Sequence, residues 1–421
     1  MAFSRFQTKF FRTHLGAQLG KTSVTYGPCQ SPTLWFCCHR HDQIATFIPR
    51  PYWSVRATVQ LDGDGDISTE YEFTAVSGEV WEESAATSLV DAAGGTATLA
   101  HATADALLHS RTLPRPLPLN TVALLKCASE RLYMGAGDTM YYAEKLYLAG
   151  LTSYPRTETS KYANGFDLRG TLRTLASAEW LPDAQAVLER AGGPPVAEEL
   201  DWLHARARAD GVDVGDHPPI TPVKLASPKA CGDARGYELY QLICQHFVAT
   251  LSDDCELHDA KLAVSIGTTS FEACVTRCAK LGWAEPLGVA IFGRDDESTL
   301  RTARFHSAAA ITKGAALRVS APPAAHKHWT QPPPHLSESE LLTLMEEHGV
   351  GTDASMATHV SNVIRRGYVQ VRALALSAPQ PFLWSLRPTA LSLVSPPHHT
   401  LDVPLPSASP PTAKLTFSPP T

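Results

Sequence analysis

A tyrosine and an arginine two residues apart are the side chains of this sequence best suited to chemistry on a phosphate ester. Tyr154 and Arg156 lie in LYLAGLTSYPRTETSKY, which runs from Leu146 to Tyr162. A phenol is an oxygen nucleophile, and a guanidinium matches the oxygens of a phosphate. Pro155 disfavours helical dihedrals at Tyr154, and residues two apart in an extended segment point to the same side. The spacing predicts that both side chains face one ligand; the alternative is a half-buried tyrosine beside a surface arginine.

Two further stretches carry side chains suited to the same ligand. In DHPPITP, residues 216–222, His217 lies beside two prolines, so its imidazole is held on a stiff backbone. It can orient a phosphate or relay a proton, with a structural histidine as the alternative. Gln30 and Ser31 are at the predicted start of a helix, where the dipole favours an anion.

Three acidic residues at alternate positions suggest a metal site that the surrounding pattern does not favour. Asp62, Asp64 and Asp66 separate two alternating segments, 52–61 and 67–76, which predict paired strands. A calcium loop needs a ligand at its twelfth position, and the next strand begins before that point. A solvated hairpin turn is the better interpretation, and no metal ligands are predicted.

The composition is that of a soluble globular protein of about two to four domains. The chain has 421 residues, a formal net charge of −6 and no apolar run long enough for a membrane span. Any nucleic-acid binding must therefore come from local patches. Nine cysteines without a CxxC pair favour reduced thiols in an intracellular protein. Residues 1–41 lack Asp and Glu, which fits either a transit peptide or a basic helix along a nucleic-acid backbone.

Helical patterns frame the tyrosine segment. An amphipathic helix is expected over 2–19 and another from Ser31 to about Ile44. Asn120 is expected to cap a third helix, and Asp138 to cap a fourth that ends just before Tyr154. More helices are expected within 167–210 and 236–252, and strands within 257–320, followed by a proline-containing connector at 325–335.

The clearest local pattern lies near the C-terminus. Ser337–Glu340 is a capping box that opens one helix, and Thr352 with Asp353 opens a second that runs to Arg366. A short strand, YVQV, follows. Helix, turn, helix and strand in this order suggest a winged-helix unit, with a plain helical hairpin as the alternative.

Six stretches together resemble one family, the type IA DNA topoisomerases, and within it the eukaryotic topoisomerase III group, nearest the beta form. They occur in the family's order and cover about a third of the chain. The stretches are AFSRFQTKFFR; TYGPCQSPTL with the following HRHDQI; PLPLNTVALLKCAS; AEKLYLAGLTSYPRTETSKY; DHPPITP; and LSESELLTLMEEHGVGTDAS with its RGYV ending.

The resemblance implies a role for each matching side chain. Tyr154 matches the family's nucleophile, and Arg156 the arginine that holds the scissile phosphate. His217 matches the active-site histidine. The side chains implied to bind DNA are Gln30, Ser31, Glu144, Thr352, Asp353 and Ser355.

The implied architecture is a multidomain α+β fold, with a toroidal core of helical domains III and IV and a β-rich arch, domain II. The N-terminal segment is then expected to be a DNA-facing helix rather than a transit peptide. The implied division is domain IV, first part, at 1–47; arch, first part, at 48–119; domain III with Tyr154 at 120–250; arch, second part, at 251–330; winged-helix-like second part of domain IV at 331–391; and a disordered Pro/Ser-rich tail at 392–421.

The implied activity is ATP-independent cleavage, strand passage and religation of DNA. The family's Toprim domain, which carries its Mg²⁺ ligands, precedes the first matching stretch. Mg²⁺ is thus expected with its ligands outside this chain, which is expected to be truncated and to lack Toprim. The expected partners are single-stranded DNA, or RNA, and a scaffold protein, with no membrane. A nuclear location is expected, with the cytoplasm also open and mitochondria less favoured. The alternative function is a non-catalytic, single-strand-binding remnant.

Overall fold

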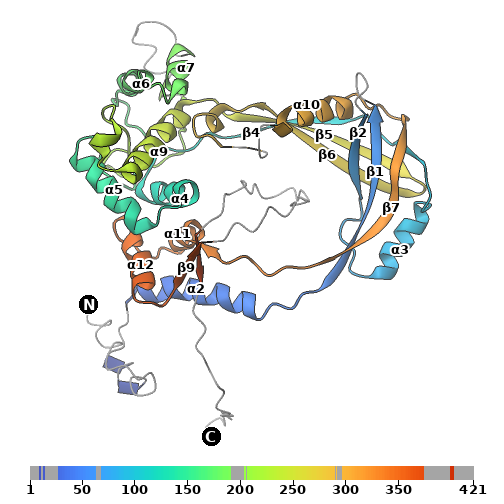
Figure 1. The fold of residues 1–421 in the computed structure, drawn as a ribbon, viewed down its shortest axis with the longest axis horizontal. Coiled ribbons are helices and arrows are strands. Elements are labelled where there is room, and N and C mark those ends of the chain that lie inside the picture. The colour runs from blue at the N-terminus through green and yellow to red at the C-terminus, as the bar shows by residue number, and fades with distance from the viewer. Residues whose placement is uncertain are drawn as a thin grey trace.

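The computed structural model describes residues 9–10, 13–14, 27–62, 68–190, 203–204, 206–289, 291, 296–373 and 399–402. Figure 1 shows them arranged as a ring, with a group of helices at one end and a β-rich part at the other. Along one side of the ring, the two are joined by the segment that follows helix α2 (Gln30–Ala45) and the segment that leads into helix α11 (Glu338–Glu347). Among the described residues, no helix is long and apolar enough to cross a membrane. All nine cysteines are free thiols.

The β-rich part is an antiparallel sheet in the order β3-β7-β1-β2-β6-β5-β4, and an added pairing of β3 with β5 closes six strands on themselves. We call this closed sheet the barrel. Val55 and Val59 are fully buried in its core, whereas Arg56 lies on the opposite face, as strand alternation requires. The strands are β1 Pro51–Asp62, β2 Ser68–Ala75, β3 Leu99–Ala102, β4 Leu107–Leu113, β5 Cys255–Ile266, β6 Thr269–Lys280 and β7 Ala316–Trp329.

The strands predicted for 52–61 and 67–76 are confirmed as β1 and β2. Three features differ from the expectations. Helix α10, Asp296–Ala309, interrupts the region expected to be strands, and helix α3, Glu83–Ala92, was not expected. Strand β7 runs to Trp329, into the stretch interpreted as a connector, because its end pairs with the start of β1.

The helices around Tyr154 share one apolar core. The predicted cap at Asn120 is confirmed, because its side chain accepts a hydrogen bond from the N–H of Ala123 at 2.8 Å. The predicted cap at Asp138 is wrong: the helix begins at Ala136, whose N–H donates to Glu338 of another helix at 2.5 Å. A tertiary contact thus replaces a local cap. The helices are α4 Thr121–Leu132, α5 Ala136–Leu148, α6 Leu168–Ala176, α7 Pro182–Arg190 and α9 Ala234–Leu251.

A third group of elements forms the base of the ring and shares a core with the outer faces of α4 and α5. The expected order of helix, turn, helix and strand is present. Ser337 accepts from the N–H of Glu340 as predicted, but the Glu340 carboxylate forms an ion pair with Arg40 of α2. The elements are α2 Gln30–Ala45, β8 Leu336–Ser337, α11 Glu338–Glu347, α12 Asp353–Arg365, β9 Gln370–Ala373 and β10 His399–Asp402.

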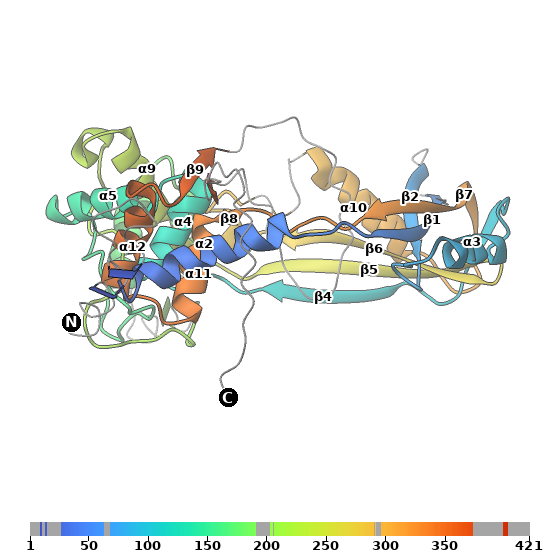
Figure 2. The same cartoon turned by 90° about the horizontal axis from the view of Figure 1, so that it is seen from below.

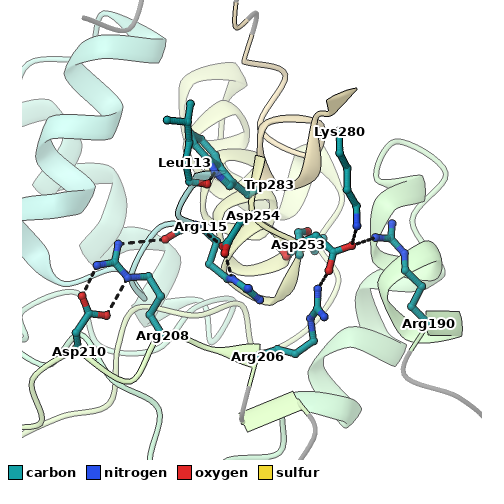
Figure 3. A network of polar contacts seen from close by, with 12 residues as sticks. Leu113, Arg115, Arg190, Arg206, Arg208, Asp210, Asp253, Asp254, Lys280 and Trp283 are labelled. Atoms are coloured by element: carbon teal, nitrogen blue, oxygen red, sulfur yellow. Dashed lines mark hydrogen bonds and ion pairs between the residues drawn. The ribbon is translucent and has the colours of Figure 1, made fainter. Parts of the chain in front are cut away.

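A network of ion pairs joins the helices to the barrel where the chain passes from α9 to β5 (Figure 3). The Asp253 carboxylate at this point bonds to three cations: Arg190 of α7, Arg206 and Lys280 of β6. One carboxylate therefore ties a helix around Tyr154 to a barrel strand. In Figure 2 the barrel extends to one side of the helical group, beyond this junction.

Several predictions fall on residues outside the described part of the chain. They are most of the helix at 2–19, the turn after Asp62 and most of the tail at 392–421. Within that tail, His399–Asp402 form β10, which pairs with β8 and β9 and was not expected from the Pro/Ser-rich composition. The division into six domain segments stays a prediction.

Candidate active site around Tyr154

The tyrosine segment leaves α5 through a tight turn and then pairs with the histidine stretch. Gly150 has a φ of +66°, in the left-handed region that favours glycine. Thr152 forms an isolated antiparallel bridge with Pro222, and the Ser153 hydroxyl donates to the carbonyl of Pro219 at 2.8 Å. The bridge and this hydrogen bond hold the two stretches side by side.

The first residue of α4 holds the other side of this segment. Thr121 is fully buried, and its hydroxyl donates to the carbonyl of Pro155 at 2.8 Å and accepts from the N–H of Thr157 at 2.8 Å. The N–H of Thr121 also donates to the carbonyl of Thr157, at 3.0 Å. The backbone on both sides of Arg156 is therefore fixed to the start of a packed helix.

Tyr154 is half-buried between two aromatic rings. Its centroid lies 5.2 Å from that of Tyr147 in an edge-on arrangement and 4.6 Å from that of His217 in a tilted one. The structure thus brings the predicted nucleophile and the predicted histidine into contact. His217 is exposed, so its imidazole is open to a ligand from solvent.

Arg156 reaches from the tyrosine segment to the start of α12. Its Nε and Nη2 donate to Oε1 of Glu144 at 3.1 and 2.5 Å, and its Nη1 donates to the carbonyl of Ala354 at 2.5 Å. Glu144 binds Arg156, and its predicted contact with DNA stays a prediction. This geometry favours a role for Glu144 in positioning the guanidinium. The contact with Ala354 also brings the predicted Thr352–Ser355 motif beside Arg156.

The side chain that orders the histidine stretch was missed from the sequence. Oδ1 of Asp216 accepts from the N–H of His217 at 2.6 Å and from the Thr159 hydroxyl at 3.0 Å. The backbone N–H of His217 is the main cause that lowers the pKa of Asp216. The Thr157 hydroxyl donates to the His217 carbonyl at 2.9 Å. A loop-turn aspartate is common, and only the fold shows that it joins His217 to the tyrosine segment.

The second predicted binding motif is built around the cap of α12. Thr352 is the N-cap residue, and Ser355 completes a capping box by accepting from the Thr352 N–H at 2.9 Å. Asp353 lies in the first turn, against Glu158 of the tyrosine segment. A hydrogen bond with Asp353, and its negative charge, raise the pKa of Glu158. The carboxyl groups of Glu158 and Asp353 therefore lie close together where the tyrosine segment meets α12.

Gln30 and Ser31 lie apart from this cluster, at the opposite end of α12. With a rise of about 1.5 Å per residue, α12 separates its two ends by roughly 20 Å. Gln30 accepts from Nη1 of Arg366 at 2.7 Å. Gln30 and Ser31 line a pocket of about 180 Å³. Its walls are Gln30, Ser31, Leu34, Asn362, Val363, Arg366 and Tyr368. Arg366 and Tyr368 were not predicted as site residues, although an arginine and a tyrosine after the second helix were a visible signal.

The described residues do not fit the Mg²⁺ that the resemblance implies. They include no group of three or more His, Cys, Asp or Glu side chains able to hold a metal ion. The carboxylates of Glu144, Glu158 and Asp216 are each engaged by a protein group. The chemistry available around Tyr154 is that of the phenol, guanidinium and imidazole.

Comparison with known proteins finds similarity to DNA topoisomerases. The sequence model of the DNA topoisomerase family matches residues 1–381. DNA topoisomerase 3-beta of Oryza sativa subsp. japonica is 35% identical over 383 residues, which cover 90% of this chain and 40% of that protein. DNA topoisomerase 3-beta-1 of Homo sapiens is 36% identical over 376 residues, which cover 88% and 40%. The chain thus spans about two fifths of the length of these relatives.

A solved structure supports the fold class. Full-length topoisomerase I from Thermotoga maritima superposes with a TM-score of 0.58 at 18% identity, covering 83% of this chain and 53% of that one. The match, with helices and an antiparallel sheet in one ring, confirms the predicted α+β core.

Proposed function

Because the chain belongs to the DNA topoisomerase family, as a type IA member similar to topoisomerase III beta, we propose that it carries the tyrosine-bearing part of a strand-passing enzyme. In this proposal the enzyme cuts one DNA strand, passes another through the gap and reseals the first. The observation that supports it most directly is the 4.6 Å contact of the Tyr154 and His217 rings, beside an arginine held on the same clamped segment.

The cut would be a transesterification. The phenol oxygen of Tyr154 attacks a backbone phosphorus and forms a bond to the 5′-phosphate, while the bond from phosphorus to the 3′-oxygen breaks. The phenol proton leaves, and the departing 3′-oxygen takes up a proton. One phosphate ester replaces another, so no ATP is needed. After strand passage the 3′-hydroxyl reverses the step.

Arg156 would neutralise the phosphate as charge develops on its oxygens. Two of its nitrogens bind Glu144 and a third binds a carbonyl of α12, so a phosphate must share or displace these partners. A guanidinium can bind a carboxylate and a phosphate at once through different N–H groups. Glu144 would thus aim Arg156 at the ligand.

His217 would orient the phosphate or relay the phenol proton. Its backbone is fixed by Asp216 and Thr157, while its imidazole stays exposed against the Tyr154 ring. An imidazole has one ring nitrogen that accepts a proton and one that donates it, which suits both tasks.

Single-stranded DNA would follow α12. The start of this helix adjoins Arg156, and its end contributes Arg366 to the pocket at Gln30. The pocket combines an amide, hydroxyls and a guanidinium with a tyrosine ring, which suits an unstacked nucleotide. Mg²⁺ is proposed only as a requirement met by groups outside the described residues.

The test is formation of a covalent protein–DNA adduct. The chain is incubated with an end-labelled single-stranded oligonucleotide and Mg²⁺, and the products are separated in SDS. Tyr154→Phe should abolish the adduct. Tyr147→Phe is a matched control, since it removes the hydroxyl of the neighbouring ring and should leave the adduct.

An adduct that persists in Tyr154→Phe would contradict the proposal, because it would show that another residue is the nucleophile. Binding of the oligonucleotide by the wild-type chain without any adduct would show that cleavage also needs the groups that meet the Mg²⁺ requirement.

A further inference from the structure

Aromatic and basic side chains gather where the barrel continues into its connections to the base of the ring, and the proposed cleavage chemistry uses none of them. At this point the start of β1 pairs with the end of β7, at one edge of the barrel in Figure 1. The pairing continues past both strands, because the N–H of Thr330 donates to the carbonyl of Arg50 at 3.0 Å. We call this group the aromatic foot; its members are Arg50, Tyr52, Trp53, Trp81, Lys327, His328 and Trp329.

One face of the aromatic foot carries a continuous row of ring systems. Tyr52 lies directly across from His328, and their rings stack with centroids 5.1 Å apart. On its other side the Tyr52 ring lies 5.7 Å from Trp81. The guanidinium of Arg50 lies over Trp81, 5.2 Å from its centroid. Stacked rings flanked by a cation are the arrangement on which single-strand-binding surfaces hold bases.

The opposite face repeats the combination. Lys327 pairs with Trp53 across the strands, and its ammonium lies 5.4 Å from the Trp53 ring. The same ammonium lies 5.4 Å from the ring of Trp329, two residues along β7. Trp53 is buried and closes the barrel core, which leaves Trp329 as the accessible ring of this face.

Exposure argues against a purely structural cluster. Trp81 is 47% exposed and Trp329 is 50% exposed, although both are among the largest apolar side chains. Three of the eight tryptophans of the chain belong to the aromatic foot. Tryptophan that is half-exposed beside cations is enriched at binding surfaces, because burying the remaining ring area then stabilises a complex.

The charges fit a nucleic-acid strand held mainly by stacking. Arg50 and Lys327 can bind phosphates of the strand. Acidic side chains offset this positive charge: Glu79 and Glu82 flank Trp81 in the sequence, and Glu72 forms an ion pair with Arg56. Since the charges nearly balance, ring stacking must carry most of the affinity. Unpaired bases offer free ring faces, whereas the bases of a duplex are already stacked.

We propose that the aromatic foot is a second binding site for single-stranded nucleic acid, in which unpaired bases stack on Trp81 and Trp329. It rests on the proposed function only in that the chain handles single strands, and it requires no cleavage by Tyr154. Its position on the barrel, away from α12, would hold a strand at a second point of the ring.

The first test locates contacts on the unmodified full chain. Oligothymidine carrying 5-iodouracil is cross-linked by light, and the modified peptides are identified by mass spectrometry. Cross-links are expected at residues 50–53, 79–82 and 326–330 in addition to those near α12. Cross-links confined to residues 30–34 and 352–368 would overturn the aromatic foot and leave the proposed function intact.

The second test measures affinity. Fluorescence anisotropy with labelled oligothymidine is expected to show about a 5- to 150-fold weakening for Trp81→Ala, the value of one base–ring stack, and little change for Trp81→Phe. Val76→Ala is the control, an exposed apolar side chain just after strand β2 of the same barrel. Unchanged binding by Trp81→Ala would overturn the proposal. If that variant unfolds, Trp329→Ala takes its place with the same criterion.

A duplex competitor separates stacking from charge. The competition uses the variant Arg366→Ala, in which the α12 pocket is weakened. An unlabelled duplex of the same length should displace the probe from this variant far less well than an unlabelled single strand does. Equal displacement would show a purely electrostatic surface and would overturn the proposal. Loss of the Tyr154 adduct with intact cross-links to the aromatic foot would instead contradict only the cleavage chemistry.

Discussion

Replacement of Glu338 by glutamine should remove a large part of the pH dependence of stability. Glu338 is 4% exposed, at the start of α11, and its carboxylate accepts from the N–H of Ala136 at the start of α5. Burial is the main cause that raises its pKa, from an ordinary 4.5 to about 7, with Asp138 adding to the rise and the Ala136 bond opposing it. The contact joins the helix before Tyr154 to the base of the ring.

The sign follows from the raised pKa. The folded protein binds this proton more tightly than the unfolded chain, so the proton's contribution to stability is complete below about pH 4.5 and is lost as the pH rises to about 7. A shift from 4.5 to about 7, at about 1.4 kcal/mol per unit, gives a change of about 3 kcal/mol. Glutamine keeps the acceptor oxygen but does not titrate.

The assay is urea unfolding of wild type and Glu338→Gln between about pH 4 and about pH 8. The free energy of unfolding of the variant, relative to wild type, should rise by about 3 kcal/mol across this range. Glu347→Gln, an exposed acid on the same helix, is the control and should follow the wild-type curve. Parallel curves for Glu338→Gln and wild type would refute the reasoning.

Two further changes probe the positioning of Tyr154. Thr121→Val keeps the shape of a fully buried side chain but leaves the Pro155 carbonyl and the Thr157 N–H without their partner. The free energy of unfolding should therefore fall by about 1–3 kcal/mol, and the adduct should form more slowly. An unchanged rate of adduct formation would contradict the role of Thr121 in holding the tyrosine segment. Asp216→Ala should slow adduct formation and Asp216→Asn should restore most of the rate, because an amide oxygen still accepts from the His217 N–H; equal rates for both variants would assign Asp216 no positioning role.

Features that depend on residues close together in the sequence could be predicted, and features that depend on distant residues could not. Asn120 and Thr352 cap their helices through neighbours three residues away, and both were predicted correctly. The start of α5 was predicted wrongly, because Glu338, far along the chain, satisfies its first N–H. Helix α10 was missed because its charged, weakly patterned sequence gains its apolar contact only from the barrel core.

The candidate site divides in the same way. The predicted nucleophile, arginine and histidine follow from their residue types and from the resemblance, and the fold places the rings of Tyr154 and His217 in contact. Thr121 bonds to Pro155, and Asp216 accepts from Thr159, so both act on segments that are distant in sequence and no local pattern indicates them. The pairing of Glu144 with Arg156 also depends on the turn between α5 and the tyrosine segment.

Under the proposed function, strand passage would require Tyr154 to move away from part of the ring without losing its own surroundings, and the contacts are distributed accordingly. Its clamp at Thr121 and its contact with His217 lie within the helical group that shares one core. Its links to α11 and α12 include single polar contacts, from Arg156 to Ala354 and from Ala136 to Glu338, alongside an apolar patch. Each of these two bonds includes a group that can carry a charge, so its exchange for water costs about 1.5–3 kcal/mol. Separation along this interface would therefore carry the nucleophile and its histidine as one unit, and it would become easier as rising pH ionises the buried Glu338.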